Sequence, residues 1–89
     1  MIEANITIIN KLGLHARAAA KLVATASAFA SDIQLEKDGK SVDAKSIMSL
    51  LMLAAGKGTE IKIITNGKDE SEACNAIVEL INNRFDEEE

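Results

Sequence analysis

The spacing between apolar residues changes along this chain, and the pattern of change constrains the fold more than any other feature of the sequence. Between Ile2 and Ile8 every second residue is apolar, which is typical of a strand with one buried face. After a loop that contains Gly13, apolar residues recur every three or four positions, the spacing of an amphipathic helix. This stripe comprises Ala19, Leu22, Val23, Ala26 and Phe29. The chain is therefore predicted to begin with a strand and a helix.

The middle of the chain reads as a hairpin. Ile33 and Leu35 alternate with polar residues, and Asp38-Gly39 suits a primed two-residue turn. Val42 is then the first residue of the second hairpin strand that is predicted to face the core. Two strands joined by a tight turn are predicted here.

The strand-like and the helix-like spacing of apolar residues both recur in the second half of the chain. A short helix is predicted from residue 46 or 47 to about residue 54, and alternation over residues 60–63 predicts a fourth strand. Asp69, followed by Glu72 three residues later, predicts a capping box that starts a last amphipathic helix ending near Phe85. The predicted order is strand, helix, two strands, helix, strand, helix.

Every predicted strand alternates, so the sheet should have one polar face and helices on the other face only. We therefore predict an α+β fold, an open-faced βαββαβα sandwich, with the order of the strands left open. The length of 89 residues allows one core, which we place in residues 1–85, followed by an acidic tail, residues 86–89. The predicted polar face carries Glu3, Asn5, Thr7, Gln34, Glu36, Glu60 and Lys62.

The formal net charge of −4 equals the charge of the acidic tail, residues 86–89, so the charges of residues 1–85 balance. With 2% aromatic residues and no basic stripe, the sequence argues against nucleic-acid and membrane partners. Cys74 is the single cysteine, which excludes an intrachain disulfide, and we read it as a core residue. No leader-like or membrane-spanning apolar run is present, and we expect a cytoplasmic protein.

His15, the single histidine, is the strongest candidate for a reactive residue. It lies where the first helix is predicted to begin, and the unpaired backbone N–H groups at a helix start favour an anion. A neutral imidazole can accept a phosphoryl group and release it again. Arg17, two residues further on, can add a charged hydrogen bond worth about 1.5–3 kcal/mol. These residue types favour reversible phosphoryl transfer, with an ordinary surface histidine as the alternative.

Two separated segments resemble one known family. Gly13-Leu14-His15-Ala16-Arg17-Ala18-Ala19-Ala20 and Lys45-Ser46-Ile47-Met48 are similar to motifs of the histidine-containing phosphocarrier (HPr) family of the bacterial phosphotransferase system. Both segments fall at the positions and separation typical of that family. The resemblance spans nearly the whole chain, and it implies an antiparallel four-stranded sheet ordered 1-4-2-3 with three helices on one face.

The resemblance also implies a function. His15 would accept a phosphoryl group from phosphorylated enzyme I, which is charged by phosphoenolpyruvate, and would donate it to IIA-type acceptors. Arg17 and the backbone amide of Ala16 would stabilise the phosphate. We therefore expect a monomeric carrier that is phosphorylated stoichiometrically, not a turnover enzyme, with neither metal nor cofactor.

The predicted short helix is apolar nearly all the way round, although such a helix on a small domain can bury only one side. The predicted core side consists of Leu50, Leu53 and Ala54. Ile47, Met48 and Leu51 are then left as an exposed patch beside the His15 loop. The resemblance implies that this patch docks enzyme I and the phosphoryl acceptors, and overpacking of the core is the alternative.

Ser46 precedes the same helix, and serine is a good N-cap residue. In many HPr proteins the matching serine is phosphorylated by a dedicated kinase/phosphorylase. Phosphate would add a charge of about −1.5 to −2 beside the apolar patch and weaken docking there. The resemblance therefore implies a regulatory site at Ser46 in addition to the cap.

Four positions depart from the family pattern. Many members have proline where Ala18 stands and asparagine where Leu12 stands, and enteric carriers have lysines at Ala24 and Ser27. Loss of two positive charges should slow electrostatic steering toward an acidic partner. The match to enteric sugar carriers is therefore weaker. The alanine-rich His15 loop and the acidic tail look more like carriers of proteobacterial systems that serve regulation. The alternative function implied by this resemblance is a regulatory carrier of a nitrogen-related or incomplete phosphotransferase system that does not drive sugar uptake.

Two other classes of function compete with the carrier. In a pure binding module Ser46 would be the switch and His15 would be idle. In a small phosphatase His15 would be the nucleophile and Arg17 the phosphate clamp. The sequence shows no second general acid or metal cluster for such an enzyme, and so short a chain offers no deep pocket.

Overall fold

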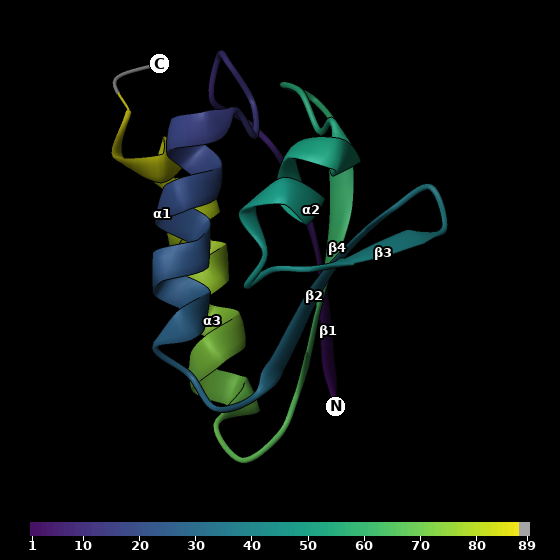
Figure 1. Ribbon diagram of the computed structural model, residues 1–89, viewed down its shortest axis with the longest axis vertical. Coiled ribbons are helices and arrows are strands. Elements are labelled where there is room, and N and C mark those ends of the chain that lie inside the picture. Colours follow the sequence, from purple (N-terminus) through teal and green to yellow (C-terminus); the bar gives the residue numbers. More distant parts are fainter. Residues whose placement is uncertain (88–89) are drawn as a thin grey trace.

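The computed structural model describes residues 1–87, and this part of the chain contains four strands, three α-helices and a short 3₁₀ turn (Figure 1). In chain order they are β1 (Ile2–Thr7), α1 (Ala16–Ser27), β2 (Asp32–Lys37), β3 (Lys40–Asp43), α2 (Ile47–Leu53), β4 (Glu60–Asn66), α3 (Glu70–Asn82) and the 3₁₀ turn η1 (Arg84–Asp86). This order confirms the predicted succession of elements.

The strands pair antiparallel in the order β1-β4-β2-β3, so β4 lies between β1 and β2. Ile63 of β4 lies opposite Ala4 of β1 on one side and Leu35 of β2 on the other, which aligns apolar residues across the sheet. The helices cover one face (Figure 1). The α+β class, the open-faced sandwich and the strand order 1-4-2-3 are therefore confirmed.

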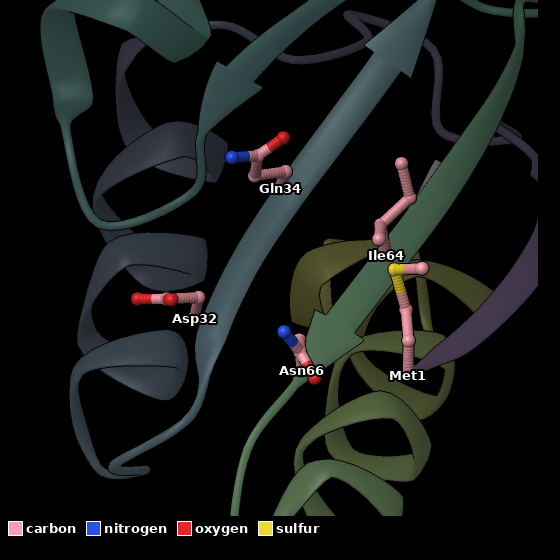
Figure 2. Close-up of a pocket in the computed structure, with 5 residues that line it drawn as sticks. All are labelled: Met1, Asp32, Gln34, Ile64 and Asn66. Carbon is pink, nitrogen blue, oxygen red and sulfur yellow. The ribbon is translucent and has the colours of Figure 1, made fainter.

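The other face of the sheet is polar, as predicted, because the seven polar side chains expected there are all exposed or half-buried. Figure 2 shows a pocket on this face, lined by Met1, Asp32, Gln34, Ile64 and Asn66. The pocket lies by the start of β1, whereas the loop toward His15 leaves the other end of that strand. It is therefore no part of the candidate site.

Apart from Cys74 and the fully buried Phe85, the hydrophobic core is aliphatic. Cys74 also lies in the core, as predicted. Val23 and Phe29, which were expected on the buried stripe of the first helix, are only partly buried. Phe29 lies beyond the end of α1, which places it at the rim of the core. The buried residues of α1 are Ala18, Ala19, Leu22 and Ala26.

The prediction that Ala54 belongs to the core is wrong. Ala54 is the C-cap residue of α2, has left-handed backbone angles (φ 55°, ψ 42°) and is exposed. Because its backbone leaves the helical conformation, its side chain no longer continues the helical stripe. The buried side of α2 consists of Leu50 and Leu53, as predicted for those two residues.

The predicted capping box at the start of α3 is also wrong. The side chain of Asp69 makes no cap hydrogen bond; it accepts hydrogen bonds from the backbone N–H groups of Ala30 (3.0 Å) and Ser31 (2.9 Å). The hydroxyl of Ser31 donates to the same carboxylate, and these hydrogen bonds lower the pKa of Asp69 to about 2. Asp69 therefore ties the start of β2 to the start of α3.

Candidate functional site

The loop before α1 is held against the segment that follows α2. The N–H of Leu14 donates to the carbonyl oxygen of Ala55 at 2.8 Å. Gly13 has φ +65°, and a Cβ atom there would lie 2.6 Å from the Ala55 oxygen and 2.6 Å from the Cα of Gly56. Only glycine fits this conformation and this close approach. The loop therefore brings the start of α1 next to the end of α2.

His15 is the N-cap residue of α1. Its backbone is extended (φ −82°, ψ −178°), and its side chain makes no cap hydrogen bond. The first helical hydrogen bond runs from the N–H of Ala19 to the carbonyl oxygen of His15, so the three intervening amides precede the helical ladder. The ring is 25% exposed. The structure therefore places a solvent-accessible imidazole at the N-terminal end of a helix.

One edge of the ring meets a carboxylate that the sequence did not suggest. Nε2 of His15 contacts a carboxylate oxygen of Glu87, and the side-chain amide of Asn10 donates to the other oxygen at 3.0 Å. The same amide donates to the carbonyl oxygen of Gly13 at 2.8 Å, and Asn10 is fully buried. Asn10, His15 and Glu87 therefore form one hydrogen-bonded cluster.

The charge of Glu87 is stabilised in this position. Burial raises the pKa of the Glu87 carboxyl, but the hydrogen bonds from Asn10 and His15 and the nearby charges of His15 and Arg17 lower it, and the net direction is downward. Glu87 is therefore an anion at neutral pH and can only accept hydrogen bonds.

The turn that delivers Glu87 is unusual. Arg84, Phe85 and Asp86 are three consecutive non-glycine residues with left-handed backbone angles (φ 56°, 53° and 63°). Such a conformation costs roughly 1–2 kcal/mol per residue. The turn is fixed by the buried ring of Phe85 and by Lys21 of α1, whose Nζ donates to the Phe85 carbonyl oxygen at 2.7 Å. Asp86 and Glu87, the first residues of the predicted acidic tail, thus lie on the folded domain.

Arg17 lies in the first turn of α1 and is exposed. Within residues 1–87 its side chain makes no hydrogen bond or ion pair, although its charge contributes to the lowered pKa of Glu87. The charge of Arg17 therefore acts on the cluster of Asn10, His15 and Glu87. Its guanidinium N–H groups make no hydrogen bond within residues 1–87, so they can donate to an anion.

The exposed apolar patch predicted on α2 is present and is larger than predicted. Its five members, which are between 36% and 67% exposed, are Leu12, Ile47, Met48, Leu51 and Met52. Leu12, in the loop before His15, was predicted only as a departure from the family pattern, and Met52 was not singled out. The Leu14 to Ala55 hydrogen bond holds the loop that carries Leu12 and His15 beside α2.

Ser46 is the N-cap residue of α2, as predicted. Its Oγ accepts a hydrogen bond from the N–H of Ser49 at 3.4 Å, and its side chain is half-buried at the edge of the patch. A modification of this hydroxyl would lie beside Ile47 and Met48.

Two further features concern the whole described chain. Across residues 1–87 no group of three His, Cys, Asp or Glu side chains is arranged to hold a metal ion. None of the helices in the same residues has the length and apolar character needed to cross a membrane.

Comparison with known proteins finds one family, by its family model and by individual relatives. A family model described as "PTS HPr component phosphorylation site" matches residues 2–83. The phosphocarrier protein HPr of Pseudomonas aeruginosa is 60% identical over 85 residues, which are 94% of each chain.

Solved structures match over all or nearly all of the chain. The crystal structure of HPr-C-His from Thermoanaerobacter tengcongensis has a TM-score of 0.97 and 50% identity, and covers 100% of both chains. A crystal structure of an HPr dimer from the same organism has a TM-score of 0.79 and 50% identity, and covers 98% of this chain and 100% of the other. The likeness therefore extends over sequence and fold together.

Proposed function

The chain belongs to the HPr family of phosphocarrier proteins of the phosphotransferase system, and we propose that His15 is the residue that carries its phosphoryl group. The donor in this proposal is phosphorylated enzyme I, charged by phosphoenolpyruvate, and the acceptor is a IIA-type protein. The observation that carries the proposal is the position of His15, a half-buried, accessible imidazole at the N-terminus of α1. As a phosphocarrier the protein is not a turnover enzyme.

The proposed transfer is a displacement at phosphorus. A ring-nitrogen lone pair of His15 attacks the phosphoryl group on enzyme I, the bond from phosphorus to the donor atom breaks, and the donor atom keeps that electron pair. His15 is the leaving group when the phosphoryl group moves on to the acceptor. Arg17 and the Ala16 amide stabilise the anion, by about 1.5–3 kcal/mol for a charged hydrogen bond and about 0.3–1 kcal/mol for a helix N-terminus.

We assign partner docking to the apolar patch on α2 and the loop before α1. Support comes from its exposure and from its position beside the His15 loop. Two of its members are methionines, which adapt to partners of different shape. Because the carrier must present this patch to successive partners, we propose that it acts as a monomer, and we propose a cytoplasmic location, which suits a protein with one free cysteine.

We propose that a kinase/phosphorylase phosphorylates Ser46, so that this residue is a regulatory site as well as the N-cap of α2. The hydroxyl lies at the start of α2 beside the patch, so a phosphate there would have to be desolvated whenever a partner docks. Phosphorylation of Ser46 would therefore weaken docking without touching His15.

A regulatory carrier of a nitrogen-related or incomplete system is the second candidate. Ala24 and Ser27, where enteric carriers have lysines, are both exposed on α1, so the exposed side of this helix lacks two positive charges. Transfer rates to a nitrogen-related IIA protein and to a sugar-specific IIA protein, measured side by side, would separate this candidate from sugar uptake.

The test of phosphoryl transfer is incubation with enzyme I and phosphoenolpyruvate labelled in its phosphoryl group. We expect one acid-labile, base-stable label per chain, located on His15, and no label on His15→Ala. A wild-type chain that stays unlabelled, or a His15→Ala variant that is labelled as well as the wild type, would overturn the proposal.

A further inference from the structure

Lys37, the last residue of β2, connects the sheet to the end of the helix that carries the apolar patch. Its Nζ donates to the carbonyl oxygen of Leu53 at 3.2 Å and to that of Ala54 at 3.1 Å. Leu53 is the last residue of α2, and Ala54 is its C-cap. One ammonium group from another element therefore holds two carbonyl oxygens at the C-terminal end of α2.

The direction of the lysine side chain follows from the strand. Successive side chains of a strand point to opposite faces of a sheet. Gln34 lies on the polar face, so Lys37, three residues later, points to the face that carries the helices. α2 lies on that face and contacts both α1 and β3 (Figure 1). The fold therefore delivers the charge of Lys37 to α2 from the helix-covered side of the sheet.

α2 depends on such support because it is short and has no charge of its own at this end. It comprises seven residues, a length at which a helix is marginal without tertiary contacts. The carbonyl groups of a last helical turn have no partner within the helix, and they favour a nearby cation. No basic residue lies in the last turn of α2. Lys37 therefore supplies from β2 the positive charge that this turn lacks.

The last turn of α2 carries part of the apolar patch. Leu51 and Met52, which are 36% and 67% exposed, lie in this turn, whereas Ile47 and Met48 lie in the first turn. The first turn is held by the cap hydrogen bond to Ser46. If the last turn were frayed, its apolar side chains would have to be ordered at each encounter, and the free-energy cost of ordering lowers affinity.

We propose that Lys37 is a positioning residue for partner docking. Its ammonium group keeps the last turn of α2 formed, and so presents Leu51 and Met52 in the conformation that a partner binds. The proposal rests on the proposed docking function of the patch. When the turn is formed in only a fraction of the molecules, the apparent affinity falls in proportion to that fraction. Within residues 1–87 the hydrogen bonds of Lys37 go only to the end of α2, so it acts on docking and not on the transfer step.

The first experiment uses backbone hydrogen exchange, followed by NMR, to test whether Lys37 holds the last turn. Lys37→Met removes the ammonium group and keeps a long side chain. The N–H of Ala54, which donates to the carbonyl oxygen of Leu51, should exchange about 5-fold faster, the upper end of what a surface cation contributes at a helix C-terminus. The N–H of Leu50, which donates to the carbonyl oxygen of Ser46 in the first turn, should keep its exchange rate.

Lys37→Arg is the rescue variant. Its guanidinium keeps the charge and has enough N–H donors for both carbonyl oxygens. Exchange at Ala54 should therefore stay close to the wild-type rate.

The second experiment measures the kinetics of phosphoryl transfer from enzyme I, with this protein as the varied substrate. Lys37→Met should raise KM by about 5-fold and leave kcat unchanged, because binding is weakened while the transfer step is not. Lys37→Arg should keep the wild-type KM.

Lys40→Met is the matched control for charge. Lys40 is the cross-strand neighbour of Lys37 and makes no hydrogen bond or ion pair within residues 1–87. The variant removes the same charge from the same hairpin and should keep the wild-type KM. An equal rise of KM in both variants would show that only electrostatic attraction to enzyme I was lost, which would overturn the proposal.

Gly39→Ala is the control for stability. It strains the same hairpin at a positive φ, and its Cβ meets nothing within 4 Å. Measured where all variants are folded, its KM should equal that of the wild type.

The outcomes separate this proposal from the function on which it rests. If enzyme I does not phosphorylate the wild-type protein, the proposed function fails and the docking role of Lys37 fails with it. If the wild type is phosphorylated, but Lys37→Met keeps the wild-type exchange rate at Ala54 or the KM of Lys40→Met, only the role of Lys37 is overturned.

Discussion

The backbone N–H and the hydroxyl of Ser31 both donate to the carboxylate of Asp69, 38 residues later in the chain, and the N–H of Asp69 donates back to the Ser31 hydroxyl oxygen. This reciprocal pair joins the start of β2 to the start of α3, at the end of α1 remote from His15. It is a structural link whose strength depends on an ionised carboxylate.

Asp69 is expected to make the fold sensitive to acid. Its pKa is lowered from 3.8 to about 2 in the folded protein, so the ionised group stabilises the fold above about pH 4 and loses this effect as the pH falls toward 2. Asp69→Asn should lower Tm at pH 7, and the difference in Tm from the wild type should shrink between about pH 4 and pH 2. Thermal unfolding followed by circular dichroism measures this.

Asp38→Asn is the control for Asp69→Asn. Asp38 is exposed in the β2–β3 turn, and asparagine tolerates its positive φ of 51°. Its Tm should follow that of the wild type at each pH. A Tm difference for Asp69→Asn that stays constant down to pH 2 would contradict the assignment.

Gly13→Ala is expected to destabilise the fold and displace the His15 loop. Alanine at φ +65° is strained by roughly 1–2 kcal/mol, and its Cβ would also collide with the backbone of Ala55 and Gly56. Gly39→Ala shares the positive φ but meets nothing within 4 Å, so it should show the strain alone. Urea unfolding of both variants separates the cost of backbone strain from the cost of the collision. If both variants lose the same free energy of unfolding, the backbone of Ala55 and Gly56 moves away from the new Cβ without cost, which would contradict this prediction.

Arg17→Ala should leave the fold intact and slow phosphoryl transfer. Arg17 is exposed, so its removal opens no cavity, while loss of a charged hydrogen bond worth about 1.5–3 kcal/mol corresponds to about 10- to 100-fold in rate. Lys40→Ala, which removes one positive charge from β3, should transfer normally. A rate for Arg17→Ala equal to that of the control would remove Arg17 from the mechanism.

Two substitutions of Ser46 should affect different properties. Ser46→Ala loses the N-cap and should reduce the free energy of unfolding by about 1 kcal/mol, with normal affinity for enzyme I. Ser46→Asp keeps a good cap but adds charge beside the patch, so stability should hold while affinity falls by about 10-fold. Urea unfolding and calorimetric titration with enzyme I test the pair.

Ser71→Asp, on the exposed side of α3, adds the same charge outside the patch and should bind normally. An affinity of Ser46→Asp that matches this control would place docking on another surface.

Most of the fold could be predicted because the apolar periods are clear. The alternation in β1, β2 and β4 and the helical stripes survive in the structure with boundaries shifted by a few residues. The strand order came from the family resemblance, since alternation defines the faces of a strand and carries no information about its neighbours. Local patterns failed where a side chain found a distant partner, as Asp69 did with Ser31.

The candidate site was only partly predictable. His15 and Arg17 are close in sequence and belong to one helix start, so local reasoning finds them together. Glu87 lies in what the composition describes as a solvated acidic tail, and its contact depends on three left-handed residues that no propensity favours. Asn10 was not singled out in the sequence, because its need for hydrogen-bond partners follows from its complete burial, which only the structure shows.

Because Glu87 follows His15 by 72 residues, the cluster of Asn10, His15 and Glu87 can form only late in synthesis. His15 leaves the ribosome early, whereas the carboxylate that meets its ring is translated 72 residues later, and closing so long a loop requires the sheet and helices to be in place. A nascent chain would therefore expose the imidazole without its carboxylate neighbour until translation has passed Glu87. Completion of the hydrogen-bonded cluster of Asn10, His15 and Glu87 would then mark the end of folding.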